Sequence, residues 1–236
     1  MTSSAAPRLV ITADDYGYAP GYDAGILAAA EAGAIDAVSA MVGEGRTPDP
    51  APLAATGVAV GLHLELPTEW PPERDRRRAA VDASLTEHWE RFEALFGRAP
   101  AHLDGHLHCH AAPQASVPVA RFAREREVPL RAVTPRHGRL VRCIGAETPD
   151  RIVGRMAEAD PARPPEITAV LEGGELPEGV TEWIVHPGRP DPSAGSSYDA
   201  GRTEDLELVL SLAGSRELRS RRASHAAAIA AASSAR

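Results

Sequence analysis

Short apolar runs alternate with longer stretches of helical pattern along most of this chain. The first run starts at Leu9 and leads into two adjacent carboxylates, Asp14 and Asp15. Apolar runs of about four to eight residues between turn-forming residues predict buried strands. On this basis, further strands are predicted at residues 37–42, 58–66, 101–103, 128–133 and 182–185.

Helix start and stop signals mark the segments between these runs. Pro20 suits the first turn of a helix and Gly33 suits its end, while Ser84 begins a Ser-Leu-Thr-Glu capping box. Residues 67–78 are predicted as an exposed loop. Helices are predicted at residues 20–33, 52–56, 84–97, 114–126, 166–171 and 203–213, and one more from Thr148 that includes Ile152, Val153 and Met156.

Alternating strands and helices over this length predict an α/β fold with a mainly parallel sheet. About seven such units favour a (β/α) barrel-like arrangement, an irregular seven-stranded barrel, over an open doubly wound sheet. Residues 1–215 are expected to form a single catalytic domain. Residues 216–236 are rich in Arg, Ala and Ser and are expected to be a C-terminal tail that is helical or frayed.

Composition and charge narrow the classes of partner. The chain has 236 residues and a formal net charge of -8, which disfavours a nucleic-acid partner. Its two cysteines do not make a disulfide framework, so a reducing compartment is expected. No segment reaches the roughly 20 apolar residues of a membrane span, and the N-terminus lacks the apolar core of a signal peptide. A cytoplasmic location is therefore expected.

Candidate catalytic residues stand where the predicted strands end. The groups are the Asp14–Asp15 pair, His63, a cluster at residues 104–110 with three histidines, and His186. In a (β/α) barrel these ends meet on one face, where a carboxylate and two imidazoles can bind Zn²⁺ or another divalent ion.

Each group also has an ordinary structural interpretation. The aspartates could cap the next helix, His63 could be a core histidine, and His186 could be a turn residue. The histidine cluster could be a solvated loop. Glu65 lies two residues after His63, so it either lines the same pocket or forms an exposed ion pair.

Four motifs in order resemble the YdjC-like carbohydrate deacetylases, a family that includes chitooligosaccharide deacetylases and hopanoid-biosynthesis-associated members. Together they extend from Leu9 to about Tyr198. The motifs are Thr-Ala-Asp-Asp-Tyr-Gly at 12–17 with Gly-Ile at 25–26, Gly-Leu-His-Leu at 61–64, His-Leu-Asp-Gly-His-Leu-His at 102–108, and His-Pro-Gly at 186–188.

The resemblance implies a barrel-like deacetylase fold with one divalent metal ion, Mg²⁺ or Zn²⁺. It implies Asp15, His63 and His106 as metal ligands, Asp14 as the general base and His186 as the general acid.

The remaining residues of the motifs receive supporting roles. Asp104 would orient a histidine, and His108, with His110 less closely, would line the site. The reverse assignment of the two aspartates stays open. Gly105 stands where the family commonly has Ser, which would loosen the loop that carries the next histidine.

The chemistry agrees with these residue types, because amide hydrolysis needs an activated water, a base and a proton for the leaving nitrogen. The expected function is therefore removal of an N-acetyl group from a sugar or sugar-containing substrate. Alternatives are another metal-dependent amidase or phosphoesterase on a similar barrel, or an inactive metal- or sugar-binding homologue. Tyr16, Tyr198 and Trp70 are candidates to stack on a sugar. The resemblance also makes a homodimer plausible.

Overall fold

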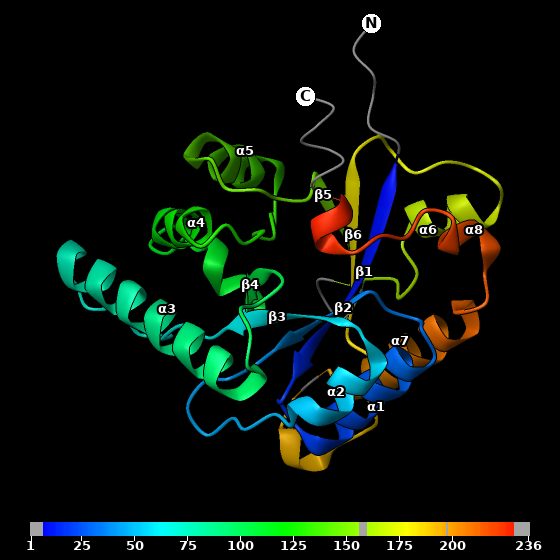
Figure 1. Ribbon diagram of the computed structural model, residues 1–236, viewed down its shortest axis with the longest axis horizontal. Coiled ribbons are helices and arrows are strands. Elements are labelled where there is room, and N and C mark those ends of the chain that lie inside the picture. Colours follow the sequence, from blue (N-terminus) through cyan, green and yellow to red (C-terminus); the bar gives the residue numbers. More distant parts are fainter. Residues whose placement is uncertain (1–6, 156–159, 197, 229–236) are drawn as a thin grey trace, which may run out of the picture.

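Six parallel strands form the centre of the computed structural model, which describes residues 7–155, 160–196 and 198–228 (Figure 1). Their order in the sheet is β4-β3-β2-β1-β6-β5, so β1 lies near the middle. The predicted α/β, barrel-like class is confirmed. The strands are β1 (Arg8–Tyr16), β2 (Ala37–Ala40), β3 (Ala59–Leu64), β4 (Leu103–Gly105), β5 (Arg151–Gly154) and β6 (Val180–Val185).

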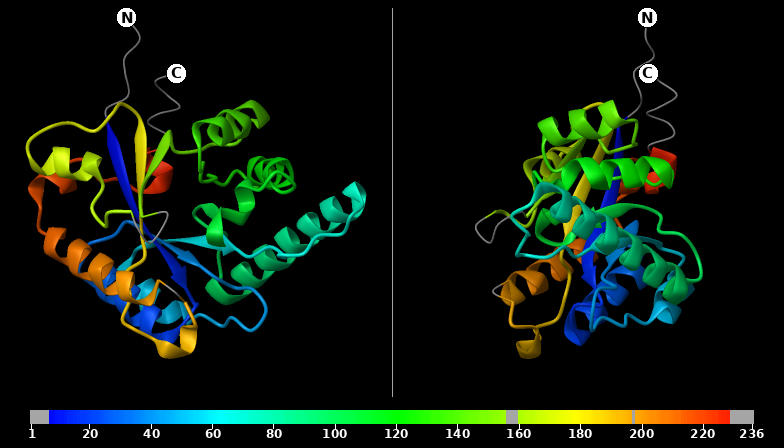
Figure 2. Two further views of the ribbon diagram at one scale, coloured as in Figure 1. Left: turned by 180° about the vertical axis from the view of Figure 1, so that it is seen from behind. Right: turned by 90° about the vertical axis from the view of Figure 1, so that its left-hand side faces the viewer.

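Helices cover the outside of this curled sheet, and Figure 2 shows them from two further sides. Helix α1 packs on α7, α4 on both α3 and α5, and α6 on α8. No helix among the described residues is long and apolar enough to cross a membrane. The helices are α1 (Pro20–Glu31), α2 (Pro50–Thr56), α3 (Arg74–Phe96), α4 (Ser116–Glu125), α5 (Pro135–Ile144), α6 (Pro165–Leu171), α7 (Asp199–Leu212) and α8 (Arg216–Arg219), with short 3₁₀ segments η1 (His106–Ala111) and η2 (Pro192–Ala194).

The two faces of the sheet differ in polarity. Leu9, Ile11 and Ala13 of β1 belong to the main apolar core that packs against the helices. Side chains alternate along a strand, so Thr12 and Asp14 point to the opposite, inner face, where both make polar contacts. The inner face therefore carries buried polar groups, and the site is built on it.

Two predicted boundaries around α3 are wrong. The helix begins at Arg74, inside the segment predicted as a loop, and Ser84 lies in its interior instead of capping it. The Arg- and Ala-rich residues 74–80 are good helix formers, and their exposed face needs no apolar pattern. Propensity on a solvated surface outweighed the apparent capping box.

The region around residues 130–155 also differs from the prediction. The helix predicted from Thr148 is wrong, because Ile152 and Val153 belong to β5, where they pair with β6. Met156, also assigned to that helix, lies outside the described residues. Helix α5 was not predicted, although Thr134 accepts a hydrogen bond from the His137 backbone N–H at its start.

The sheet of the described residues has six strands and not seven. The predicted strand at 128–133 makes only a single bridge, between Leu130 and Leu103 of β4. Pro129 lacks a backbone donor, which limits any longer ladder at this edge. The C-terminal tail forms α8 and then returns to the sheet, where Arg222 makes a single parallel bridge with Leu9.

Candidate metal centre and catalytic pocket

A β-bulge lets two neighbouring aspartates of β1 serve one site. Opposite β2, the register advances three residues on β1, from Ala13 to Tyr16, against two on its partner. Asp15 adopts a left-handed backbone conformation with φ 75°. In a regular strand, Asp14 and Asp15 would point to opposite faces, but an extra residue re-aims the side chain. Both carboxylates line one pocket.

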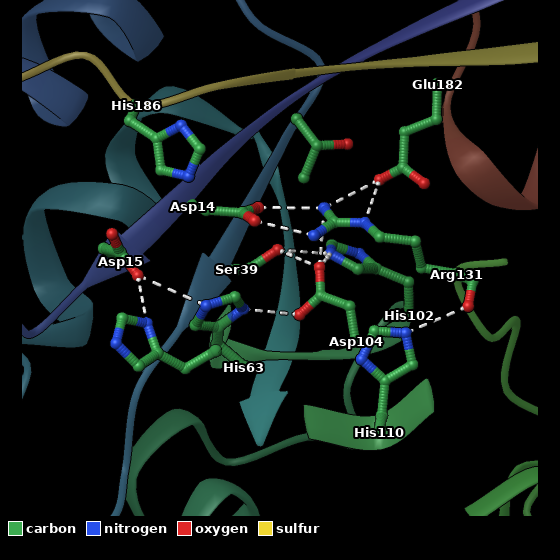
Figure 3. Close-up of polar contacts among 12 residues, drawn as sticks. Asp14, Asp15, Ser39, His63, His102, Asp104, His110, Arg131, Glu182 and His186 are labelled. Atoms are coloured by element: carbon green, nitrogen blue, oxygen red, sulfur yellow. Dashed lines mark hydrogen bonds and ion pairs between the residues drawn. The ribbon is translucent and has the colours of Figure 1, made fainter. Parts of the chain in front are cut away.

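Asp15 meets two histidines through one of its oxygens. Its Oδ1 lies 3.2 Å from His63 Nε2 (Figure 3) and 3.0 Å from His106 Nδ1. These three ligand atoms all lie within 4.8 Å of one another. The other oxygen, Oδ2, accepts a hydrogen bond from Arg202 at 2.5 Å. Burial alone would raise the pKa of Asp15, but the hydrogen bonds from His106 and His63 and the charge of Arg202 lower it well below its usual range.

His63 is held between two carboxylates. Its Nδ1 lies 2.7 Å from Asp104 Oδ1, while its Nε2 faces Asp15. Burial by itself would lower the pKa of His63, but Asp104, Asp14 and Asp15 raise it well above its usual value. The surroundings therefore favour a positive charge at this ring, either a proton or a bound cation. A carboxylate behind the far nitrogen is also the usual support of a metal-ligating histidine.

Asp14 is bound in a different way, by a buried guanidinium. Arg131 donates to both oxygens of Asp14, with NH1 at 2.6 Å from Oδ2 and NH2 at 2.8 Å from Oδ1. The same guanidinium contacts Glu182 at 2.9 and 3.1 Å and Asp104 at 2.7 Å. Arg131 is 1% exposed, so this cation sits among three buried carboxylates (Figure 3). A bidentate pair of this kind fixes the orientation of the Asp14 carboxylate.

His186 approaches the pocket from the end of β6. Its backbone N–H donates to Asp205 Oδ2 at 2.8 Å, and Tyr198 Oη donates to the same oxygen at 3.2 Å. Among the described residues, the His186 Nδ1 atom has no hydrogen-bond partner, and Asp205 Oδ2 lies 4.0 Å away. Burial lowers the pKa of His186, and the nearby carboxylates of Asp15 and Asp14 only partly offset this.

These groups surround one pocket of about 500 Å³. It contains both proposed catalytic residues, all three proposed metal ligands, and the candidate residues His108 and Tyr198. The lining residues are Asp14, Asp15, Tyr18, His63, Gly105, His106, Leu107, His108, Arg155, His186, Gly195, Ser196, Tyr198 and Arg202.

Several predicted site residues lie elsewhere. Tyr16 is 1% exposed and donates its hydroxyl to the Asp49 carbonyl, so it cannot stack on a sugar. Glu65 pairs with Arg46 at 3.5 Å and does not line the pocket. His110 is buried, with Nε2 against the Arg131 carbonyl, and burial lowers its pKa to about 3. Trp70 lies in a separate hollow on the surface.

The loop that carries His106 is strained but closely packed. Leu107 and His108 both adopt left-handed backbone conformations, with φ of 49° and 57°. Such conformations cost non-glycine residues about 1–2 kcal/mol each and often occur at functional sites. A Cβ at Gly105 would come 2.8 Å from Cys109 Sγ, so the loop packs on Gly105 too closely for a side chain there. The expected loosening of the loop stays a prediction.

A second group of possible ligands is less suitable for a metal ion. Asp14, His63 and Asp104 also bring ligand atoms within 4.8 Å of one another. Arg131 already occupies oxygens of both aspartates, and the His63 nitrogen nearest Asp104 bonds to it at 2.7 Å. The group of Asp15, His63 and His106 lines the open pocket, and its donors of two imidazoles and one carboxylate suit Zn²⁺.

Sequence reasoning missed the residues that hold these groups in place: Ser39, Arg131, Glu182, Arg202 and Asp205. Ser39 donates to Asp104 at 2.7 Å and contacts His102 at 2.9 Å. One signal was available, because charged residues inside apolar runs, such as Arg131 and Glu182, are rarely buried without a partner.

The fold and the site together define a barrel-like α/β protein with a candidate metal centre at the carboxyl ends of its strands. A model of the family described as YdjC-like protein matches residues 8–220, and the chain belongs to this family.

Comparisons with individual proteins agree with this assignment. A chitooligosaccharide deacetylase of Yersinia pestis (strain Pestoides F) is 34% identical over an alignment of 147 residues, and the match covers 52% of this chain and 58% of that protein. The protein of the same name from Yersinia pestis bv. Antiqua (strain Angola) is 33% identical over 147 residues, with the same shares of both chains. The match therefore spans little more than half the length of these relatives.

One solved structure shares the fold over nearly the whole chain. It is a protein from Enterococcus faecalis V583 named as a candidate for cellobiose-phosphate cleavage. The two chains are 22% identical with a TM-score of 0.65, and the match covers 92% of this chain and 94% of that one.

Proposed function

We propose that this chain is a metal-dependent hydrolase that removes an N-acetyl group from a carbohydrate or sugar-containing substrate. One observation carries the proposal. Asp15, His63 and His106 bring three metal-ligand atoms together, in the same pocket as Asp14 and His186. Membership of the YdjC-like family and relatives named chitooligosaccharide deacetylase support the same conclusion.

We assign the metal ion to Asp15 Oδ1, His63 Nε2 and His106 Nδ1. A divalent ion bound there would act as a Lewis acid and lower the pKa of a bound water. Zn²⁺ and Mg²⁺ are the candidates. Two imidazoles favour Zn²⁺, since Mg²⁺ prefers oxygen ligands.

Asp14 is proposed as the general base. Arg131 engages both of its oxygens, and a carboxylate offers about four lone-pair positions, so room remains for a water. The ion pair holds the carboxylate in one orientation, and a base must be aligned before its pKa matters.

His186 is proposed to give a proton to the departing nitrogen. Because burial lowers its pKa, the imidazole is neutral at pH 7 in the free protein. It must therefore gain a proton during the reaction, and the proton that Asp14 removes from water is the available source. Asp205 would keep His186 in place by accepting the hydrogen bond from its backbone N–H.

The proposal is tested by acetate release from N-acetylglucosamine oligosaccharides, with the protein stripped by EDTA and reloaded with Zn²⁺ or Mg²⁺. Turnover is expected only after reloading, and Asp14→Asn is expected to abolish it. Glu65→Gln is the matched control, because this carboxylate pairs with Arg46 outside the pocket. Metal binding without acetate release from any substrate would instead favour an inactive metal- or sugar-binding homologue.

Two expectations beyond the reaction belong to the proposal. We propose that the protein acts in the cytoplasm on a small N-acetylated sugar. We also propose that it forms a homodimer, which sedimentation equilibrium of the purified chain tests.

A further inference from the structure

The C-terminal segment after α8 returns to the start of β1. Leu9 donates its N–H to the Arg221 carbonyl at 2.9 Å and accepts the Ala223 N–H at 2.9 Å. The side chain of the same segment is also held, because the Arg222 guanidinium donates to Asp36 Oδ1 at 2.9 Å and to the Gly33 carbonyl at 2.7 Å. Figure 1 shows this segment, in red, lying against β6. The segment is therefore fixed to the sheet from two directions.

The following residues fill the inner face of the sheet. Ala228 is fully buried in a small apolar cluster with Val10, Ala37 and Val180, which belong to three neighbouring strands. These positions lie near the starts of their strands, whereas the pocket lies at the strand ends. The segment thus closes the inner face on the side opposite the pocket.

His225 is the polar residue that this segment inserts. It is 2% exposed, and its Nε2 lies 3.1 Å from Thr12 Oγ1 and 3.5 Å from Glu182 Oε1. Its ring stacks on His102 with a centroid distance of 4.4 Å and an angle of 18°. The glycine at position 61 in β3 makes room for the His102 ring, because a Cβ there would overlap it.

Two chains of contacts lead from His225 to the pocket, one through polar groups alone and one that begins with the ring stack on His102. The first passes through Glu182 and Arg131 to Asp14, with contacts of 2.9 Å and 2.6 Å after the His225 contact.

The second chain starts at the stacked His102 ring. It passes through Ser39 and Asp104 to His63, with contacts of 2.9, 2.7 and 2.7 Å. Figure 3 shows the contacts of the first chain from Glu182 to Asp14 and those of the second from His102 to His63. Both groups at the pocket are thus connected to one buried side chain from the C-terminal segment.

We propose that His225 is a positioning residue that holds Asp14 and His63 in place through these two chains. The inference rests on the proposed function, in which Asp14 is the base and His63 a metal ligand. Without the Nε2 contacts, Glu182 would lose a partner that fixes its orientation, and without the ring, His102 would lose the surface on which it stacks. The substrate touches neither Glu182 nor His102, so the loss of their orientation should lower kcat while KM stays nearly constant.

The test compares His225→Phe and His225→Gln with the wild-type chain. Phe keeps the stacked ring but removes the contacts of Nε2, whereas Gln keeps a hydrogen-bonding group. Ala226→Gln is the control, because this neighbouring residue is exposed. Measured quantities are kcat and KM for acetate release, the dissociation constant for Zn²⁺, and the melting temperature.

We expect His225→Phe to lower kcat about 10-fold, with KM within twofold. It should also weaken Zn²⁺ binding about 10-fold, because Glu182 holds Arg131, which contacts Asp104 behind His63 as well as Asp14. His225→Gln restores a hydrogen-bonding group but not the stacked ring, so it should recover most of the loss in kcat and less of the loss in Zn²⁺ affinity, and Ala226→Gln should match the wild type. A variant with an altered melting temperature but wild-type kcat and Zn²⁺ affinity would show a merely structural role and overturn the proposal.

The two proposals can fail separately. If the wild type binds Zn²⁺ but releases no acetate, the proposed function fails, and Zn²⁺ affinity alone decides the role of His225. Equal affinity of the wild type and His225→Phe would then overturn that role as well.

Discussion

Arg131→Lys should destabilise the protein strongly although it keeps the positive charge. The guanidinium makes five contacts of 2.6–3.1 Å with Asp14, Asp104 and Glu182. An ammonium group has three N–H donors, so at least two of these contacts are lost. Hydrogen bonds to charged groups contribute about 1.5–3 kcal/mol each, which gives a loss of about 3–6 kcal/mol. That is a large part of the roughly 5–15 kcal/mol that stabilises a typical domain.

Urea unfolding followed by circular dichroism measures this loss, with Arg124→Lys as the control. Arg124 lies on α4 with its side chain 50% exposed, and its substitution should change the free energy of unfolding by less than about 0.5 kcal/mol. A change of less than about 1 kcal/mol for Arg131→Lys would refute the reasoning, because the buried contacts would then contribute little.

Removal of the positive charge at position 131 should make the loss of stability depend on pH. In Arg131→Met, Asp104 and Glu182 lose the charge that lowers their pKa in the folded protein, so burial raises their pKa above that of the unfolded chain. The folded state then binds more protons, and its stability falls as pH rises. The deficit relative to the wild type should therefore be largest near pH 7 and smaller near pH 5. A deficit that does not depend on pH would contradict this account.

Three further predictions concern packing and titration. Burial lowers the pKa of His102 and of His110 to about 3, so the free energy of unfolding should fall by about 1.4 kcal/mol per pH unit for each ring as pH decreases from about 6.5 to 3. In urea unfolding across this range, His110→Gln should remove the contribution of one ring to this slope. An unchanged slope would contradict the prediction. Leu107→Gly should keep or raise the free energy of unfolding, by up to about 1 kcal/mol, because Leu107 is 87% exposed and left-handed, and a loss above about 1 kcal/mol would count against the strain. Gly61→Ala should cost about 1–3 kcal/mol or more in thermal unfolding, because its Cβ would overlap the His102 ring, whereas Gly214→Ala, with open space around it, is the control that should stay near wild type.

Much of the site could be predicted because the carboxyl ends of parallel strands meet. The position of a residue at a strand end was enough to bring Asp15, His63, His106 and His186 into one pocket. Asp14 was also predicted at the site, but the backbone feature that turns it and Asp15 to the same pocket was not. A regular strand would turn the two aspartates apart, and the bulge that prevents this has no clear signature in the residues.

The supporting residues could not be predicted because their roles depend on contacts between distant segments. Arg131 is 117 residues from Asp14 and 51 from Glu182 along the chain, and only the folded sheet brings these charges together. The C-terminal segment shows the same limit. Its Ala- and Arg-rich composition predicted a helical or frayed tail, and nothing in it indicated that His225 and Ala228 would be buried on the sheet.

Secondary structure failed where local signals competed. The Thr148–Pro149 pair resembles a helix start, but Ile152 and Val153 are β-branched and join an available sheet edge beside β6. Helix α5 is the opposite case, because Thr134 and Gly145 flank it as ordinary caps, and these two residues would have predicted it. Sheet pairing decided the first case, and capping chemistry was sufficient in the second.

The central claim is that Asp15 binds the metal ion while Asp14 does not. It is tested most directly by the metal content of the purified protein after Zn²⁺ loading and dialysis, measured for the wild type, Asp15→Asn and Asp14→Asn. We expect about one equivalent in the wild type and in Asp14→Asn, and a large loss in Asp15→Asn. Loss of metal in Asp14→Asn with retention in Asp15→Asn would contradict the account and reverse the roles of the two aspartates.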